Sequence, residues 1–149
     1  MTTVLLDSGP LGLVTNPSGS SQAFECNQWL KFLISSGYRV FVPEIADYEV
    51  RRELLRANKI RGIERLDNLI DQIGYTPITR EVMLKAAEFW ANARKQGQPT
   101  ANNQSLDADV ILAAQAFMIS SHGEDAVIAT TNVRHLTRFV PAKLWHEIT

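Results

Sequence analysis

Four short segments of this 149-residue chain place an acidic or amide side chain where chemistry could occur. Asp7 follows an apolar run, and Glu49 and Asp109 each lie early in a helical stretch. Asn132 follows another apolar run near the end of the chain. Acids at the carboxyl end of a strand, or in the first turns of a helix, point into the crevice where open α/β sheets bind ligands. Oxygen donors that converge there would hold a hard divalent cation, Mg²⁺ or Mn²⁺.

The elements that must hold these residues alternate between strand and helix. Continuous apolar runs predict strands over 4–6, 38–42 and 126–130, with a short strand over 75–78. Apolar residues at helical spacing predict helices over about 24–34, 44–58, 62–73, 79–96 and 107–121. Strands joined through helices pair in parallel with right-handed crossovers, so we expect a three-layer α/β/α sandwich with a central, mainly parallel sheet.

Local signals give the ends of these elements. Gly37 is placed to end the 24–34 helix, and Thr79 to cap the helix that follows it. Glycine and proline make the segment 9–21 a predicted loop on the ligand side. The polar, breaker-rich segment 97–105 is a second predicted loop, and the end of the chain is a short tail. No second core follows 97–105, so residues 1–149 are expected to form a single domain.

Some apolar side chains carry expectations about burial. Tyr48 and Leu55 are predicted to face inward from the 44–58 helix, as are Met83 and Trp90 from the 79–96 helix. On the early helices, candidates for an exposed apolar face that binds a partner are Trp29, Phe32 and the stripe from Ile63 to Ile70.

Composition permits a cytoplasmic enzyme of ordinary character. The hydrophobic content is 45%, the charged content is 21% and the net charge is −1, so attraction to a nucleic acid would have to be local. The single cysteine, Cys26, excludes an intramolecular disulfide and a cysteine-based zinc site, and it fits a reducing compartment. No apolar run approaches the ~18 residues of a membrane span. We therefore expect a cytoplasmic protein without a membrane segment.

The order of the chemical segments resembles that of the PIN-domain nucleases, and within them the VapC-type toxins of type II toxin–antitoxin pairs. The matching pieces are Leu-Asp-Ser at Asp7, Pro-Glu-Ile-Ala-Asp-Tyr-Glu-Val at Glu49, Asp-Val-Ile-Leu-Ala-Ala from Asp109, and Ala-Thr-Thr-Asn-Val-Arg at Asn132. The resemblance runs from Val4 to about residue 139. The chain departs from it at 134–136, which read Arg-His-Leu where relatives often read Arg-Asp-Phe.

The resemblance implies a PIN-like fold and a Mg²⁺- or Mn²⁺-dependent endoribonuclease. It implies that Asp7, Glu49, Asp109 and Asn132 are catalytic, and that Asp7, Asp109 and Glu49 bind the metal. A metal held by Asp7 and Asp109 is the minimal arrangement. It also implies an RNA substrate, a cognate antitoxin and a homodimer.

Asp107 and Asp109 cannot both face one crevice from a regular helix. Two residues turn a helix by about 200°. We expect Asp109 to face the metal, and Asp107 to be the N-cap of its helix or to lie outside the direct ligands.

Basic residues around the acidic site would hold backbone phosphates. Arginine and lysine are densest over 51–65, and Arg134 and Arg138 form a second group near Asn132. The predicted substrate contacts are Ser8, Arg51, Arg52, Arg56, Thr131 and Arg134. Plain structural alternatives remain for several of these positions. Glu49 and Arg52 could belong to a solvated charge ladder, and Asn132 could serve only as a turn former.

Two other classes of protein stay open. One is a PIN fold that binds RNA or protein without cutting it. The other is a different acidic-pocket α/β enzyme, such as a haloacid-dehalogenase-type phosphatase or a phosphoacceptor receiver domain. The phosphatase needs an aspartate two residues after the first, but position 9 is glycine. The receiver needs an acid at the end of its third strand, and 75–78 has none.

Overall fold

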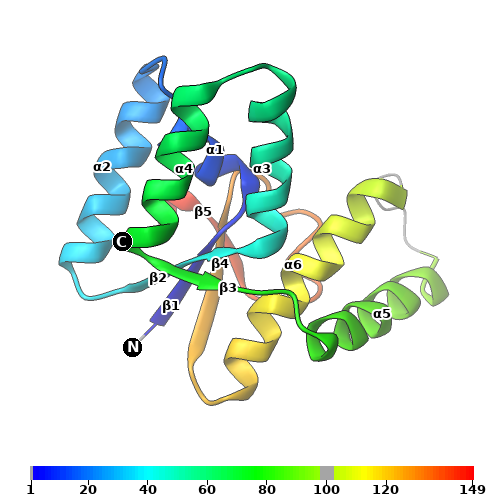
Figure 1. Ribbon diagram of the computed structural model, residues 1–149. Helices are drawn as coiled ribbons and strands as arrows, with labels where there is room; N and C mark the ends of the chain where they lie inside the picture. The colour runs from blue at the N-terminus through cyan, green and yellow to red at the C-terminus, as the bar shows by residue number, and fades with distance from the viewer. Residues whose placement is uncertain (1, 98–102) are drawn as a thin grey trace.

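The computed structural model describes residues 2–97 and 103–149 and shows a central sheet between helical layers (Figure 1). The strands are β1 Thr2–Leu6, β2 Arg39–Pro43, β3 Gly74–Thr76, β4 Asp125–Thr130 and β5 Ala142–Leu144. The helices are α1 Ser8–Thr15, α2 Ser21–Ser35, α3 Glu44–Arg56, α4 Ile60–Gln72, α5 Arg80–Lys95 and α6 Asn103–Ser121, followed by a 3-10 turn at Trp145–Glu147. The strands form one sheet in the order β3-β2-β1-β4-β5, and every pair is parallel.

Alternate residues of the central strands bury opposite faces of the sheet. Val4 and Leu6 of β1 pack into a core shared with α1, α2, α3 and α4. Leu5 and Ile128 pack on the other side with α6. The α5 helix lies outside α6 and buries Val82 against it. Figure 1 shows this division, with α2 and α4 on one side of the sheet and α6 and α5 on the other. The fold is therefore the expected three-layer α/β/α sandwich.

The strand order places a ligand crevice at the carboxyl end of β1. The chain passes outward from β1 to β2 and β3, and later returns to the other side of β1 with β4 and β5. Open α/β sheets bind ligands where the order changes direction in this way. The β1–β4 register pairs Leu6 with Ala129, so Asp7 and Thr130, which follow these residues, are neighbours at this point.

Several local predictions are confirmed. Thr79 is the N-cap of α5, and its hydroxyl accepts a hydrogen bond from the Val82 amide at 3.2 Å. Gly37 follows α2 with φ +89°, a left-handed conformation that glycine adopts without steric cost.

The loop predicted over 9–21 is wrong in its first half, because residues 8–15 form α1. The Asp7 carboxylate caps this helix by accepting from the Ser8 amide at 2.7 Å. Pro10 lies in the first turn, where backbone N–H groups have no intrahelical partner and a proline is tolerated. Burial of Leu11 and Val14 in the core outweighs the local preference of the glycines for a loop. The tail also contains an unpredicted strand, β5, which adds the fifth strand to the sheet.

The 97–105 loop is also shorter than predicted. Residues 98–102 lie outside the described residues, and α6 already begins at Asn103. Leu106, in the first turns of α6, is 1% exposed and packs with Val82 of α5. This contact between helices stabilises about one more turn than the polar sequence indicates.

Four predictions of inward-facing side chains are wrong. Tyr48 and Leu55 of α3 are 56% and 57% exposed, and Met83 and Trp90 of α5 are 47% and 38% exposed. The α3 helix is buried mainly along the side that carries Ile45, Ala46 and Val50, and α5 is covered mainly by α6. A helix with one covered side buries a narrower stripe than its apolar content suggests.

Trp29 was a candidate for an exposed face with core burial as the alternative, and the structure places it in the core. Its indole Nε1 donates to the Ile148 carbonyl at 2.8 Å, and its ring meets that of Trp145 edge to face at 5.5 Å. Phe32, on the same helix, is exposed as predicted. Within the described residues no helix is both long and apolar enough to span a membrane.

Candidate active site

Asp7 lies at the carboxyl end of β1, beside Thr130 of β4. Its amide continues the β1 ladder by donating to the Ala129 carbonyl at 2.9 Å. One carboxylate oxygen, Oδ1, accepts from the Ser8 amide at 2.7 Å, and the other, Oδ2, accepts from the Thr130 hydroxyl at 2.7 Å. A carboxylate oxygen has further lone pairs, so both oxygens remain able to accept another partner. Two short hydrogen bonds thus fix the orientation of this group without exhausting it.

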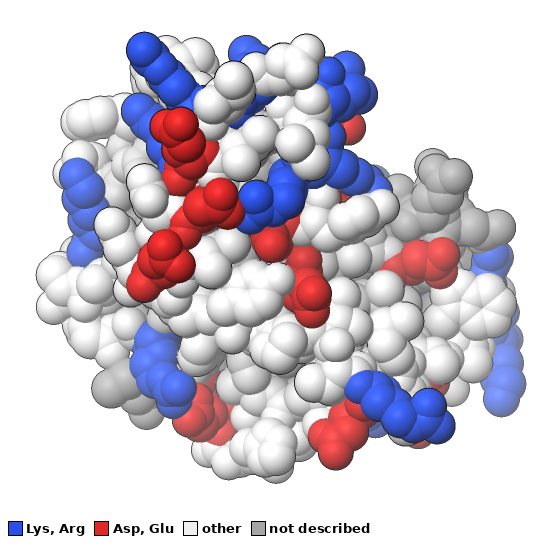
Figure 2. Space-filling view, in the orientation of Figure 1, with Lys and Arg blue, Asp and Glu red and all other residues white. Residues whose placement is uncertain are grey.

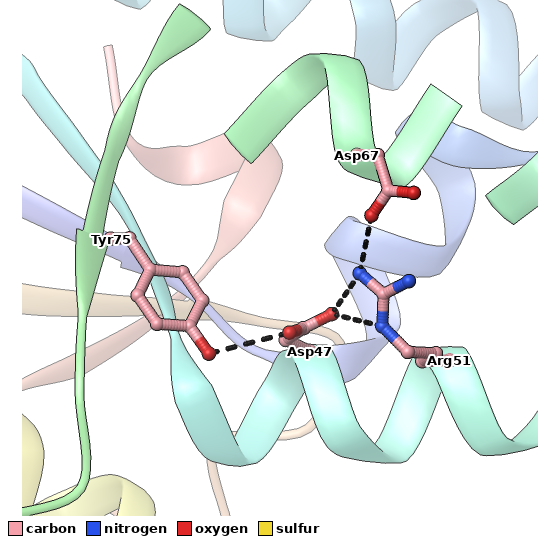
Figure 3. A network of polar contacts seen from close by, with 4 residues as sticks. All are labelled: Asp47, Arg51, Asp67 and Tyr75. Atoms are coloured by element: carbon pink, nitrogen blue, oxygen red, sulfur yellow. Dashed lines mark hydrogen bonds and ion pairs between the residues drawn. The ribbon is translucent and has the colours of Figure 1, made fainter. Parts of the chain in front are cut away.

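Glu49 is positioned by a network on the opposite side of α3. Arg51 lies 3.0 Å from Asp47 of the same helix and 2.7 Å from Asp67 of α4, and the Tyr75 hydroxyl of β3 donates to Asp47 at 3.3 Å (Figure 3). The network joins α3 to α4 and β3. Glu49 is two residues from both Asp47 and Arg51, or about 200° around the helix. The contacts that hold one side of α3 therefore turn Glu49 toward the crevice.

A buried glutamine joins the helices that carry the other two acids. Gln115 of α6 has no exposed surface. Its amide nitrogen donates to the Thr76 carbonyl at 2.7 Å, and its amide oxygen accepts from the Ile45 amide at 3.4 Å. This side chain connects α6, which carries Asp109, to the first turn of α3, which carries Glu49. The two helices therefore keep a fixed relation at the crevice.

The three acids lie close enough to influence one another's charge. Burial raises the pKa of the Glu49 carboxyl to about 7, and the negative charge of Asp7 adds to the rise. Burial likewise raises the pKa of Asp109 to about 6, again with a contribution from Asp7. The pKa of Asp7 is itself raised by burial, although the Thr130 and Ser8 hydrogen bonds oppose the rise. Asp7, Glu49 and Asp109 are therefore one electrostatic cluster.

Two arginines reduce the repulsion among the three carboxylates. Arg52 lowers the pKa of Glu49, and Arg138 lowers that of Asp109, but in each case burial has the larger effect. At neutral pH the cluster therefore holds carboxylates that are costly to ionise. A bound cation would remove that cost.

The donor set fits a hydrated divalent cation better than a closed protein cage. Among residues 2–97 and 103–149, no three His, Cys, Asp or Glu side chains are gathered closely enough to enclose a metal ion. Mg²⁺ commonly uses one or two carboxylates and fills its remaining positions with water and substrate phosphate. Asp7 and Asp109, the pair expected from the sequence, match that requirement, and Glu49 lies beside them.

Asn132, the fourth predicted site residue, lies in the turn after β4, and its side chain stabilises that turn. Its backbone N–H donates to the Thr130 hydroxyl at 3.1 Å, and its side-chain Oδ1 accepts from the Arg134 amide at 3.1 Å. This is the turn geometry weighed above as the structural alternative. The side-chain NH₂ group is still a donor, so a turn role and a role toward a water molecule are compatible.

The start of α1 and the turn after β4 approach each other at Gly9. A Cβ atom at this position would lie 2.6 Å from the Thr131 hydroxyl oxygen and 2.7 Å from its methyl carbon. The absence of a side chain at Gly9 lets the segment bearing Asp7 and the segment bearing Asn132 meet. Thr131 is exposed at this contact, and Ser8 lies beside it as the first residue of α1.

Two site predictions need correction. Asp107 is not the N-cap of its helix, because α6 begins four residues earlier at Asn103; Asp107 is an exposed residue of that helix. Arg51 is also an unsuitable phosphate ligand, because two carboxylates already compensate its charge. Sequence spacing could not reveal either fact, since both depend on how α3, α4, α5 and α6 pack.

Two residues that serve the site were missed from the sequence. Thr130, the last residue of β4, holds Asp7 through its hydroxyl, and Gln115 holds α6 against α3. Each had a weak signal. Thr130 ends a strand in an otherwise apolar run, and Gln115 interrupts the run Ala113-Ala114-Gln115-Ala116. Such polar residues, when buried, are satisfied by specific partners.

The basic residues are distributed unevenly around the crevice. Figure 2 shows lysine and arginine gathered over the region where α3 leads into α4, while acidic residues extend over the side of α4. Arg52, Arg56 and Lys59 line a groove that reaches the site. Arg134 is exposed in the turn that follows Asn132. Positive charge therefore flanks the acids along α3 and in the turn after β4.

The fold closely matches solved structures of bacterial VapBC and FitAcB proteins. VapBC2 from Rickettsia felis bound to a DNA fragment from their promoter matches with a TM-score of 0.72 and 14% identity, over 96% of this chain and 98% of that chain. VapBC-1 from nontypeable Haemophilus influenzae matches with a TM-score of 0.70 and 17% identity, over 97% of this chain and 98% of that chain. FitAcB from Neisseria gonorrhoeae matches with a TM-score of 0.70 and 19% identity, over 97% of this chain and 99% of that chain.

Sequence comparison adds nothing to this likeness. No protein-family model matches the chain, and no curated protein matches it. At 14–19% identity, the structural agreement establishes the fold alone. Within that limit, the agreement covers nearly every residue of each pair of chains, and the chain shares the PIN-like α/β/α fold of these VapBC and FitAcB structures.

Proposed function

We propose that this protein is a Mg²⁺- or Mn²⁺-dependent endoribonuclease and the toxin of a type II toxin–antitoxin pair. The observation that carries the proposal is the cluster of Asp7, Glu49 and Asp109, whose carboxyl pKa values are raised together at the ligand-binding edge of the sheet. Acids that are costly to ionise without a cation suit a metal-dependent hydrolase. The test is RNA cleavage by the purified protein with Mg²⁺, and its loss when EDTA is added.

Asp7 and Asp109 would hold the cation. When bound, it would polarise the scissile phosphodiester and make an attacking water more acidic. Asp7 is already oriented by Ser8 and Thr130, so its carboxylate needs no rearrangement to serve as a ligand. Such preorganisation is a large part of electrostatic catalysis.

Glu49 is suited to accept the proton of the attacking water. Its pKa of about 7 lies near the pH at which a general base is most effective. The network of Asp47, Arg51 and Asp67 fixes the helix from which it projects. Attack by water breaks the phosphodiester directly, so no nucleophilic side chain is required.

A prediction concerns Asn132, which we propose orients the attacking water through its side-chain NH₂ group. Asn132→Ala should lower turnover markedly, because the water loses a donor, while changing the Mg²⁺ requirement little. Asn132→Asp should keep activity and tighten Mg²⁺ binding, because a carboxylate is the stronger ligand. Mg²⁺ titrations of the cleavage rate measure both quantities. Cleavage by Asn132→Ala at the wild-type rate in saturating Mg²⁺ would reduce Asn132 to the turn residue that its Arg134 contact describes.

We also propose a cognate antitoxin and a homodimer. The antitoxin is in keeping with the VapBC and FitAcB structures that share the fold. Apolar side chains on α2 offer a partner surface, since Phe24, Phe32 and Ile34 are 64%, 47% and 48% exposed. Light scattering at micromolar concentration should give twice the mass of one chain. A single-chain mass across that range would rule out the dimer.

The second candidate is a PIN fold that binds RNA without cutting it. The turn role of the Asn132 side chain favours it, because the fourth position then contributes structure instead of chemistry. RNA binding without any Mg²⁺-dependent cleavage would select this alternative.

A further inference from the structure

A groove leads away from the acid cluster between α1 and α3. It opens at Ser8 and Glu49, beside the acids, and ends near Lys59 after α3, enclosing about 630 Å³. That volume lies within the range of pockets that hold one drug-sized ligand, or about one or two nucleotides. A polymer that is cut at the acids extends beyond them on both sides of the scissile bond. The groove offers one path for such an extension.

The α1 wall of the groove is unusually open. Gly12 lines it, and a Cβ atom at Gly12 would meet nothing within 4 Å. The open space at this position lies in the groove, since the helix is packed on its other side through Leu11 and Val14. A ligand can therefore approach the backbone of α1 closely, as glycine permits.

The α3 wall carries more basic than acidic side chains. Arg52, Arg56 and Lys59 line the groove together with Glu49 and Glu53, and both carboxylates act electrostatically on Arg52. Arg56 is paired with Glu53 at 2.9 Å, but within residues 2–97 and 103–149 no carboxylate lies within ion-pair distance of Arg52 or Lys59. The Arg52 guanidinium lies 5.0 Å from the centre of the Tyr48 ring, a cation–π contact at the surface. A guanidinium can bind a phosphate or stack on a base.

We infer that the groove between α1 and α3 binds the single-stranded RNA segment next to the scissile bond, with Arg52 and Lys59 on its phosphates. This inference rests on the proposed function. Glu49 of the acid cluster and Ser8, the neighbour of Asp7, line the groove, and basic side chains outnumber acidic ones along its α3 wall. A nucleic-acid strand matches both features. A single strand fits such a groove, because its bases can be splayed apart inside it.

The test uses a matched pair of substitutions at Gly12. Asp and Asn have nearly the same volume, so Gly12→Asp and Gly12→Asn fill the groove equally and differ only in charge. Neither strains the fold, because the site is open and a non-glycine residue stabilises a helix. Binding is measured by fluorescence anisotropy with a labelled ten-nucleotide single-stranded RNA and full-length protein in EDTA, where no cleavage occurs. Circular dichroism confirms that each variant is folded.

Gly12→Asp should bind the RNA about fivefold or more weakly than Gly12→Asn at 50 mM salt, and the difference should narrow at 0.5 M salt. Arg52→Gln and Lys59→Gln should each lower the slope of log affinity against log salt by about 0.7, the value for one phosphate contact with a single strand. Arg80→Gln, on the far helix α5, serves as control and should leave the slope unchanged. These three results together support the groove.

Other outcomes separate this inference from the proposed function. Equal binding by the two Gly12 variants, with normal Mg²⁺-dependent cleavage by the wild type, overturns the groove and keeps the nuclease. Groove-dependent binding without cleavage overturns the nuclease and keeps an RNA-binding groove. Equal competition by a ten-base-pair duplex overturns the single-strand assignment. Groove-dependent binding of a hexaglutamate peptide, but not of RNA, makes the groove a peptide site instead.

Discussion

Replacing Asp109 with asparagine should abolish the Mg²⁺-dependent cleavage of RNA while leaving the fold intact. The change removes a charged ligand at almost constant shape. The lost rate should be at least about 10²–10³-fold, the range observed when one electrostatic contact to a transition state is removed. The measurement is a time course of RNA cleavage by the wild type and by Asp109→Asn, and a reaction with EDTA gives the baseline without metal.

Asp107→Asn is the matched control for this substitution. It makes the same chemical change two residues away, on an exposed part of α6. Its cleavage rate should stay close to that of the wild type. If Asp107→Asn is the more damaging of the two, the assignment of Asp109 to the crevice is wrong. Undiminished cleavage by Asp109→Asn would remove it from the metal site altogether.

The rate of cleavage at limiting Mg²⁺ should rise about 10³-fold between pH 5 and pH 8. The pKa values of Asp109 and Glu49 are raised to about 6 and about 7, so at pH 5 about one in ten of the first and one in a hundred of the second are ionised. The product of the two fractions is about 10⁻³, and near pH 8 it approaches one. Saturating Mg²⁺ should shift the rise to lower pH, because the cation favours the ionised forms.

The stability of the metal-free protein should change with pH in the opposite direction. Asp109 and Glu49 have ordinary pKa values of 3.8 and 4.5, so between those values and the raised ones the folded state binds more protons than the unfolded state. Stability therefore falls as the pH rises from about 4 to about 7. Thermal unfolding in EDTA should show this fall, and Asp109→Asn should reduce it. A flat profile in both proteins would contradict the raised pKa values, whatever the outcome of the cleavage assay.

Much of the fold could be predicted because its signals are local. The apolar run that forms β1, the spacing that forms α2 to α5 and the cap at Thr79 all depend on residues near one another in sequence. The four segments that carry Asp7, Glu49, Asp109 and Asn132 could also be recognised locally. An acid at the end of a strand is visible in the sequence without knowledge of its neighbours in space. A parallel α/β sheet then brings the ends of β1 and β4 to one edge, where Asp7 lies beside Thr130.

The details of the site depended on partners far away in the sequence. The sequence predicted a phosphate contact for Arg51, because it is a basic residue near the acids. In the structure Asp67, sixteen residues away on α4, compensates its charge. The partners that fix Asp7 and α6, namely Thr130 for Asp7 and Thr76 for Gln115, are set by strand register and helix packing. Residues 8–15 became a helix because the core buries Leu11 and Val14, against the local preference of glycine and proline.

The sequence by itself determined which groups are available and on which kind of element each one lies. Only the tertiary structure decided which of them share an environment. Periodicity and capping act over a few residues, whereas the raised pKa values of Asp7, Glu49 and Asp109 arise from burial and from charges that meet across β1, α3 and α6. Burial and Coulomb interaction depend on distance in space, and distance in space is what folding supplies.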